Sequence, residues 1–87
     1  VLSVVSQHRF DPATVAVKAA IDSGLLGKIV LANAAVPWFR TQAYYDSGDW
    51  RGTWAMDGGG ATMNQGVHTV DVLLYLAGNV SQVAAFY

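Results

Sequence analysis

The sequence predicts an α/β fold in the order strand, helix, strand, loop, helix, strand. Two observations predict it: apolar runs of strand length alternate with two helix-length segments, and each helical segment ends at a glycine. Hydrophobic residues make up 53% of the 87 residues and charged residues only 13%, a composition typical of a folded domain with a core. Helices that alternate with strands indicate an α/β layer, whose last strands need not be parallel.

The first strand and the first helix occupy the N-terminal part of the chain. Residues 1–5 form an apolar, β-branched run of strand length. In the helix that follows, Asp11 can cap the free N–H groups, Pro12 suits the first helical position, and Gly24 favours a left-handed stop. We expect one face of this helix to lie on a sheet, and that face carries Ala13, Ala16, Val17, Ala20 and Ile21.

The second half of the chain begins with a strand and a long connection. Residues 27–37 form the second predicted strand, apolar on both faces. No periodicity survives over 38–58, and loops of this length in a small domain are usually functional or disordered. Its aromatic residues favour a functional loop: Trp38, Phe39, Tyr44, Tyr45, Trp50 and Trp54. A second helix is predicted over 60–77, ended by Gly78, and a last strand over 80–87.

Charge and cysteine content exclude several classes of function. The net charge is −1 and the five basic residues are scattered, which argues against nucleic acid and anionic membrane as partners. Without cysteine there is no disulfide or thiolate metal site, which fits a reducing, cytoplasmic compartment. No apolar run approaches the roughly 18–20 residues that span a bilayer. The chain opens on an apolar run without initiator Met or cleavage site, so we expect a piece of a longer protein.

The candidate site lies in the second helix, where Asn64, His68 and Asp71 are spaced by four and then three residues. At about 100° per residue these side chains share one stripe. His68 would titrate near neutral pH, Asn64 can donate and accept hydrogen bonds without ionising, and Asp71 could orient His68. The alternative is that His68 is a satisfied residue of the core. No metal is expected, because a third ligand at usable spacing is lacking. A separate apolar stripe, predicted to be buried, contains Met63, Val67, Val70 and Leu74.

Two features lie just before this helix. The glycines at 58–60 permit positive φ and a close approach of a ligand to the backbone, but they do not form a phosphate cradle. Trp50 and Arg51 pair a flat ring with a fixed cation, which suits a sugar face, a carboxamide or a phosphate. The alternative for this pair is an aromatic ring packed under the loop beside a solvated Arg51.

Five blocks in order resemble the Gfo/Idh/MocA family of NAD(P)-dependent oxidoreductases, the glucose–fructose oxidoreductase and inositol dehydrogenase type. These blocks are SQHRFDP, IDSGLLGKIV, DWRG, GGG and NQGVHTVDVLLYLAG. The resemblance implies a two-domain enzyme, with an N-terminal Rossmann domain for NAD or NADP and a C-terminal α/β domain with an open mixed sheet for a sugar or polyol. Residues 1–10 would then be the last Rossmann strand and the crossover, and residues 11–87 the first part of the C-terminal domain.

The resemblance also implies roles for individual residues. Asn64 and His68 would be catalytic: many members have Asp where Asn64 stands, so Asn64 would orient a substrate hydroxyl while His68 moves a proton. The family's Lys, in a Glu-Lys-Pro motif, and the Gly-rich cofactor loop would lie upstream of this chain. Arg9, Trp50 and Arg51 match family positions near the cofactor or the substrate, and we expect them to contact the cofactor.

The predicted function is therefore part of an enzyme that transfers a hydride between NAD(P) and the carbinol carbon of a sugar, polyol or related cyclic alcohol. The complete protein is expected to form homo-oligomers, whereas residues 1–87 alone should be inactive. The alternative is a non-catalytic carbohydrate-binding or scaffold module on the same fold, favoured by the aromatic loop and by the non-ionisable residue at position 64. A metal-dependent hydrolase is a third, weaker hypothesis.

Overall fold

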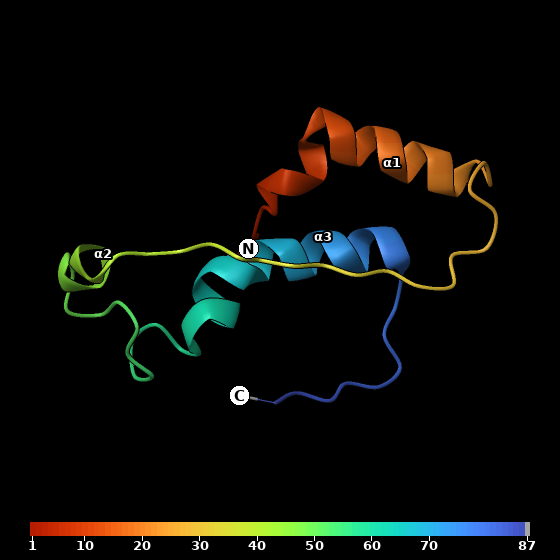
Figure 1. Cartoon of the computed structure of the whole chain (residues 1–87). Coiled ribbons are helices and arrows are strands. Elements are labelled where there is room, and N and C mark those ends of the chain that lie inside the picture. Colours follow the sequence, from red (N-terminus) through yellow and green to blue (C-terminus); the bar gives the residue numbers. More distant parts are fainter. Residues whose placement is uncertain (87) are drawn as a thin grey trace. The chain divides into compact units, whose positions relative to one another are not determined.

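The structure is a computed structural model that describes residues 1–86, and helices are the only regular elements in that range (Figure 1). Contacts within the chain define two compact units. The first contains Val1–Asn33 and the residues from Asp71 onward, and the second contains Ala34–Val70. The elements in chain order are the 3-10 helix η1 (Gln7–Phe10), α1 (Pro12–Asp22), α2 (Gln42–Asp46), the π-helical turn η2 (Thr62–Gly66) and α3 (Val67–Ala77).

The predicted α/β fold with an open mixed sheet is wrong for the part of the chain that the structure describes. The three apolar segments at 1–5, 27–37 and 80–86 carry no strand, and η1 follows the segment expected to be the last Rossmann strand. The physical reason is that a strand exists through its ladder of hydrogen bonds to a neighbour. A β-branched, apolar composition shows that a segment would fit a pleated sheet. Composition alone does not make that segment a strand. Tyr87, at the end of the last predicted strand, lies outside the described residues.

The first helix forms where the sequence predicts it. Pro12 occupies the first position of α1, and Asp11 stands at the N-cap in extended conformation, with φ −61° and ψ 136°. The predicted side-chain cap is absent: the carboxylate of Asp11 instead contacts Nδ1 of His8 at 2.8 Å. The helix start therefore depends on the extended backbone of Asp11 and on the fixed φ of Pro12.

The end of α1 confirms the predicted left-handed stop. Gly24 has a φ of +75°, a conformation that costs an L residue steric strain. The N–H of Leu25 donates to the carbonyl of Ala20, and the N–H of Gly24 donates to that of Ile21, both at 3.0 Å. This pair of bonds is the Schellman arrangement, which satisfies the last carbonyls of the helix.

The second predicted helix is also present, but it is not uniform. Residues 60–77 are helical throughout, and the chain then leaves the helix at Gly78, whose φ is +96°. Within this segment Thr62–Gly66 winds as a π-helix, which the sequence analysis did not predict. Gly66 is buried, and a Cβ there would lie 3.2 Å from the carbonyl oxygen of Ala61. The absence of a side chain at Gly66 thus permits the wider turn.

Of residues 1–86, Gly66 alone is buried, and no apolar side chain in that range forms a core. The prediction that one stripe of the second helix is buried is wrong, since all four of its members are exposed: Met63, Val67, Val70 and Leu74. The apolar face of α1 has no sheet to cover it either. Apolar helix faces are buried only when a second layer packs on them, and the described residues supply no such layer.

Candidate functional site

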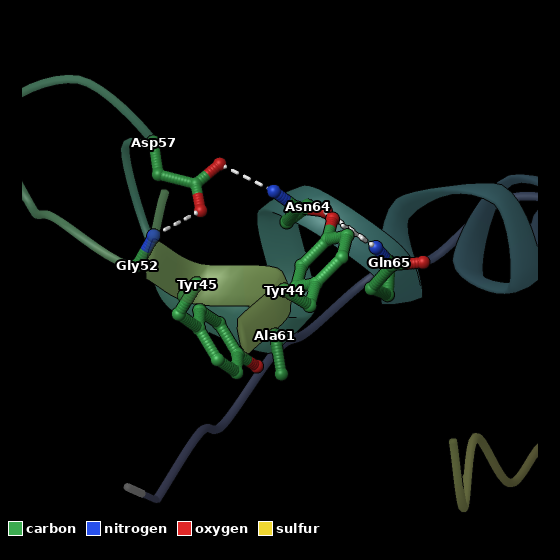
Figure 2. A pocket seen from close by; sticks show the side chains of 8 residues that line it. Tyr44, Tyr45, Gly52, Asp57, Ala61, Asn64 and Gln65 are labelled. Atoms are coloured by element: carbon green, nitrogen blue, oxygen red, sulfur yellow. Dashed lines mark hydrogen bonds between the residues drawn. The ribbon is translucent and has the colours of Figure 1, made fainter. Parts of the chain in front are cut away.

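A pocket of about 240 Å³ lies within the unit Ala34–Val70 (Figure 2). Sites for small molecules commonly measure roughly 300–1,000 Å³, so this pocket suits one small polar group or part of a larger ligand. Tyr44 and Tyr45, both from α2, meet edge-on on one side of it, with ring centroids 5.3 Å apart. The lining residues are Tyr44, Tyr45, Gly52, Asp57, Gly60, Ala61, Asn64 and Gln65.

The carboxylate of Asp57 joins the loop to the helical segment. Its Oδ2 accepts a hydrogen bond from the backbone N–H of Gly52 at 2.8 Å, and its Oδ1 accepts one from Nδ2 of Asn64 at 2.7 Å (Figure 2). Gly52 has a φ of +69°, which turns its N–H toward the carboxylate. Asp57 therefore closes the turn from 52 to 57 and holds one side of Asn64.

The opposite side of the Asn64 amide is also engaged. Its Oδ1 accepts a hydrogen bond from Nε2 of Gln65 at 2.7 Å, and the hydroxyl of Tyr44 lies at a long 3.4 Å (Figure 2). The same Nε2 of Gln65 donates to the Tyr44 hydroxyl at 3.0 Å. Asn64 therefore lies where the sequence placed a site residue, inside a polar network on the wall of the pocket.

Arg51 lies between two aromatic rings. Its guanidinium carbon is 4.5 Å from the ring centroid of Tyr44 and 4.4 Å from that of Trp50, within cation–π range. Nη1 donates to the Tyr44 hydroxyl at 2.8 Å, while Nε is buried and finds no hydrogen-bond partner among the described residues. Trp50 remains 41% exposed. The alternative of a packed ring beside a solvated Arg51 does not fit these contacts, because Trp50 is exposed and Arg51 is held between the two rings.

The predicted row of polar side chains crosses the boundary between the two units. His68 lies half-buried in the first turn of α3, in the same unit as Asn64, whereas Asp71 belongs to the other unit. There Asp71 accepts two hydrogen bonds from Arg9, from Nε at 2.8 Å and from Nη2 at 2.6 Å. The hydrogen bond to Asp71 raises the pKa of Arg9 further, against a smaller opposing effect of desolvation. The predicted orientation of His68 by Asp71 stays a prediction.

Arg9 has a second contact in the same unit. Its guanidinium carbon lies 5.0 Å from the ring centroid of Tyr75, and Nζ of Lys18 lies 5.6 Å from the same ring. These contacts link η1 and α1 to α3. Arg9 thus has a structural role that the sequence did not predict, and its side chain is still 41% exposed for other contacts.

The sequence did not single out two polar side chains of the pocket, those of Asp57 and Gln65. Asp57 directly precedes the three glycines and resembles an ordinary loop acid, while Gln65 stands next to the predicted residue Asn64. Tyr44 was noted only as one of several loop aromatics. One local signal in the sequence points to both residues. They are polar and lie close to a Gly-rich helix start, where a ligand can approach the backbone.

Two kinds of feature are absent from residues 1–86. No group of three or more His, Cys, Asp or Glu side chains in that range is arranged to hold a metal ion. No helix there has the length and apolar character needed to cross a membrane.

Comparison with known proteins identifies the family. Residues 14–87 match the family model described as the GFO/IDH/MocA C-terminal domain. The chain belongs to the Gfo/Idh/MocA family. This membership confirms the resemblance drawn from the five sequence blocks, and it makes the chain a member of a family that is generally one of oxidoreductases and typically uses NAD(P). No curated protein and no solved structure matches the chain.

Within this Gfo/Idh/MocA chain, the matched range contains the whole pocket and His68, whereas Arg9 precedes it. Of the residues predicted to contact the cofactor, Trp50 and Arg51 lie in the unit Ala34–Val70, and Arg9 lies in the other unit. Residues 1–86 contain no glycine-rich cradle for the phosphates.

Proposed function

We propose that the chain supplies the substrate-binding part of an oxidoreductase that transfers a hydride between NAD(P) and the carbinol carbon of a sugar, polyol or related cyclic alcohol. The main support is the pocket, where Asn64 lies beside the carboxylate of Asp57 and near the hydroxyl of Tyr44. Such a mixture of donors and acceptors complements hydroxyl groups, which both donate and accept. The complete enzyme would be this chain together with the cofactor-binding domain that the proposal requires.

Asn64 and His68 have separate tasks in this proposal. The amide of Asn64 binds the oxygen of the reacting alcohol and fixes its direction, because an amide cannot exchange a proton at neutral pH. When the alcohol is oxidised, the hydride leaves its carbon and the proton leaves its hydroxyl. His68, half-buried in the first turn of α3, accepts that proton directly or shares the task with the family's Lys.

Trp50, Arg51 and Arg9 are proposed to contact the cofactor. Bound NAD(P) supplies the nicotinamide carbon that accepts the hydride. The exposed ring of Trp50 offers a flat apolar surface, while the guanidinium groups offer donors for carboxamide or phosphate oxygens. Arg51 is already held by Tyr44 and Trp50, so its position is fixed before any ligand arrives.

A non-catalytic carbohydrate-binding module is the second candidate function. Two observations favour it: Trp54 is 75% exposed and Trp50 41% exposed, as rings that stack on sugar faces would be. In addition, His68 is not among the residues that line the pocket. In this case the chain would bind a sugar without changing it.

The test measures turnover and binding on the same preparation of the complete enzyme. A panel of cyclic polyols and sugars is mixed with NAD⁺ or NADP⁺, and reduced nicotinamide is followed by its absorbance. We expect at least one alcohol to be oxidised. Calorimetric titration of the same panel runs in parallel, and sugar binding without any turnover would replace the oxidoreductase proposal with the binding module.

A further inference from the structure

We infer that Asp57 is the positioning residue that fixes the amide of Asn64 toward the substrate. The inference rests on the proposed function in one respect, since it assumes that Asn64 meets the reacting alcohol. Its structural part is independent of that assumption. It begins from the hydrogen bond that Oδ1 of Asp57 accepts from Nδ2 of Asn64 at 2.7 Å.

The orientation of an asparagine amide is determined when each neighbouring group can only donate or can only accept hydrogen bonds. An ionised carboxylate only accepts hydrogen bonds, so the group that Asn64 turns toward Asp57 has to be its NH₂. Asp57 cannot rotate away easily, because its other oxygen accepts from the backbone N–H of Gly52 at 2.8 Å. The carboxylate is thus held on one side by the main chain and holds Asn64 on the other.

The far side of the amide gives the same orientation independently. Nη2 of Arg40 donates to Oε1 of Gln65 at 3.1 Å, and a guanidinium only donates. Gln65 therefore turns its Nε2 toward Asn64 and donates to Oδ1 at 2.7 Å. The hydrogen bonds run in one direction from Arg40 through Gln65 and Asn64 to Asp57, with a cation at the start and an anion at the end.

This chain of bonds decides what Asn64 offers a ligand. Gln65 occupies its oxygen, and Asp57 takes one of the two hydrogens on Nδ2. The second Nδ2 hydrogen remains to donate to an alcohol or carbonyl oxygen in the pocket. Without the carboxylate, only the hydrogen bond from Gln65 holds the amide in this orientation.

The first experiment tests the orientation in the complete enzyme labelled with ¹⁵N-asparagine. The side-chain NH₂ signals of Asn64 are assigned as those lost in Asn64→Ala. In Asp57→Asn one oxygen is left for two donors, the N–H of Gly52 and the NH₂ of Asn64, and the charge is lost, so the Asn64 signals should shift. Asp49→Asn removes a charge from an exposed position in the same loop and should leave them unchanged. Unshifted Asn64 signals in Asp57→Asn would overturn the inference.

The second experiment tests the positioning role by kinetics. Losing a hydrogen bond to a charged group typically costs a factor of roughly 10–100, so Asp57→Asn should lower kcat/KM for the alcohol by about that factor. The KM for NAD(P) should stay as it is. In an Asn64→Ala background, Asp57→Asn should have little further effect, because Asp57 acts through Asn64. Equal losses in both backgrounds would overturn the positioning role.

The outcomes separate this inference from the proposed function. If the wild-type complete enzyme oxidises no alcohol, the proposed function fails, and the Asn64 signals alone decide the structural part. If the enzyme is active and Asp57→Asn leaves its kinetics unchanged, the inference fails and the proposed function stands. Should Asp57→Asn not fold, Asp57→Glu keeps the carboxylate and displaces it by one methylene, and it should still shift the Asn64 signals.

Discussion

Arg9 and Asp71 form a two-point ion pair between residues 62 positions apart in the sequence, with N–O distances of 2.8 and 2.6 Å. A planar guanidinium matches a carboxylate in this way, whereas the point charge of a lysine does not. The pair ties η1 to α3 within one unit, and the Tyr75 ring lies next to Arg9. It is thus a long-range contact that orders the start of the described chain.

The first prediction concerns this pair. Arg9→Lys keeps the charge but loses the fork, so the urea midpoint of the complete enzyme should fall nearly as far as in Arg9→Ala. Asp22→Ala is the matched control, because Asp22 is exposed and pairs with Lys18 within one helix, and such pairs contribute little. If the urea midpoint of Arg9→Lys equals that of the wild type, a positive charge at position 9 is sufficient for the stabilising effect and the fork is not needed.

The second prediction is the pH dependence of the same pair. Asp71 raises the pKa of Arg9, so the guanidinium stays charged at every pH below its already high unfolded value. A basic group with a raised pKa loses its stabilising effect only as the pH rises through that pKa. The difference in urea midpoint between wild type and Asp71→Asn should therefore be constant from about pH 7 to pH 10. Added salt should reduce the difference, because the pair is partly exposed.

The third prediction concerns the glycines before the second helix. Gly60 has a φ of +59° and open space around its missing Cβ, so Gly60→Ala should cost about 1–2 kcal/mol through the backbone alone. A Cβ at Gly59 would instead lie 2.5 Å from Cγ of Met63. Met63→Ala removes this Cγ and leaves the Cβ of residue 63 at 3.3 Å, so it should rescue Gly59→Ala in part and should not rescue Gly60→Ala. Thermal unfolding of the two double variants distinguishes these causes, and equal rescue would contradict them.

The fourth prediction exchanges the two side chains that meet in the pocket. Asn64→Asp sets two carboxylates against each other at the 2.7 Å contact, so stability should fall as the pH rises above about 4. Adding Asp57→Asn gives the carboxylate at 64 a donor again, and Gln65 supplies a second one. The double variant should have a higher urea midpoint at pH 7 than Asn64→Asp alone. A double variant no more stable than the single one would contradict the direct contact.

Local signals in the sequence predicted helices and missed what depends on distant partners. Around α1 the signals lie within a few residues of the helix ends, as Pro12 and Gly24 show, and the structure confirms them. The strands failed because their hydrogen bonds need a neighbouring strand, which a local apolar pattern cannot supply. The buried stripe failed for a related reason: burial at Met63 or Leu74 requires a second layer.

The candidate site was predictable to a similar extent. Helical spacing and family resemblance singled out Asn64, which lines the pocket. Its partners are less visible in the sequence. Asp57 lies seven residues before Asn64 and Tyr44 lies twenty before it, and the loop in between has no periodicity. The π-helical turn was missed because Gly66 resembles any glycine tolerated within a helix. Contacts across such loops depend on backbone geometry that residue spacing does not encode.

The fifth prediction tests the catalytic role of His68. If His68 carries the proton, His68→Ala in the complete enzyme should lower kcat/KM for the alcohol by roughly 10²–10⁴-fold. Cofactor binding should survive, because NAD(P) is proposed to bind mainly to the other domain. Asn64→Ala should cost less, because it removes orientation and leaves proton transfer in place.

A purely structural His68 gives the opposite pattern. His68 is half-buried in α3, and losing its contacts would lower stability by about 1–3 kcal/mol while the folded enzyme kept its chemistry. Melting temperature and single-turnover hydride transfer are therefore measured on the same variant. The folded fraction of the wild type and of the variant is determined first, so that a loss of folded protein is not counted as a loss of rate. Unchanged hydride transfer with a lowered melting temperature would remove His68 from the catalytic site.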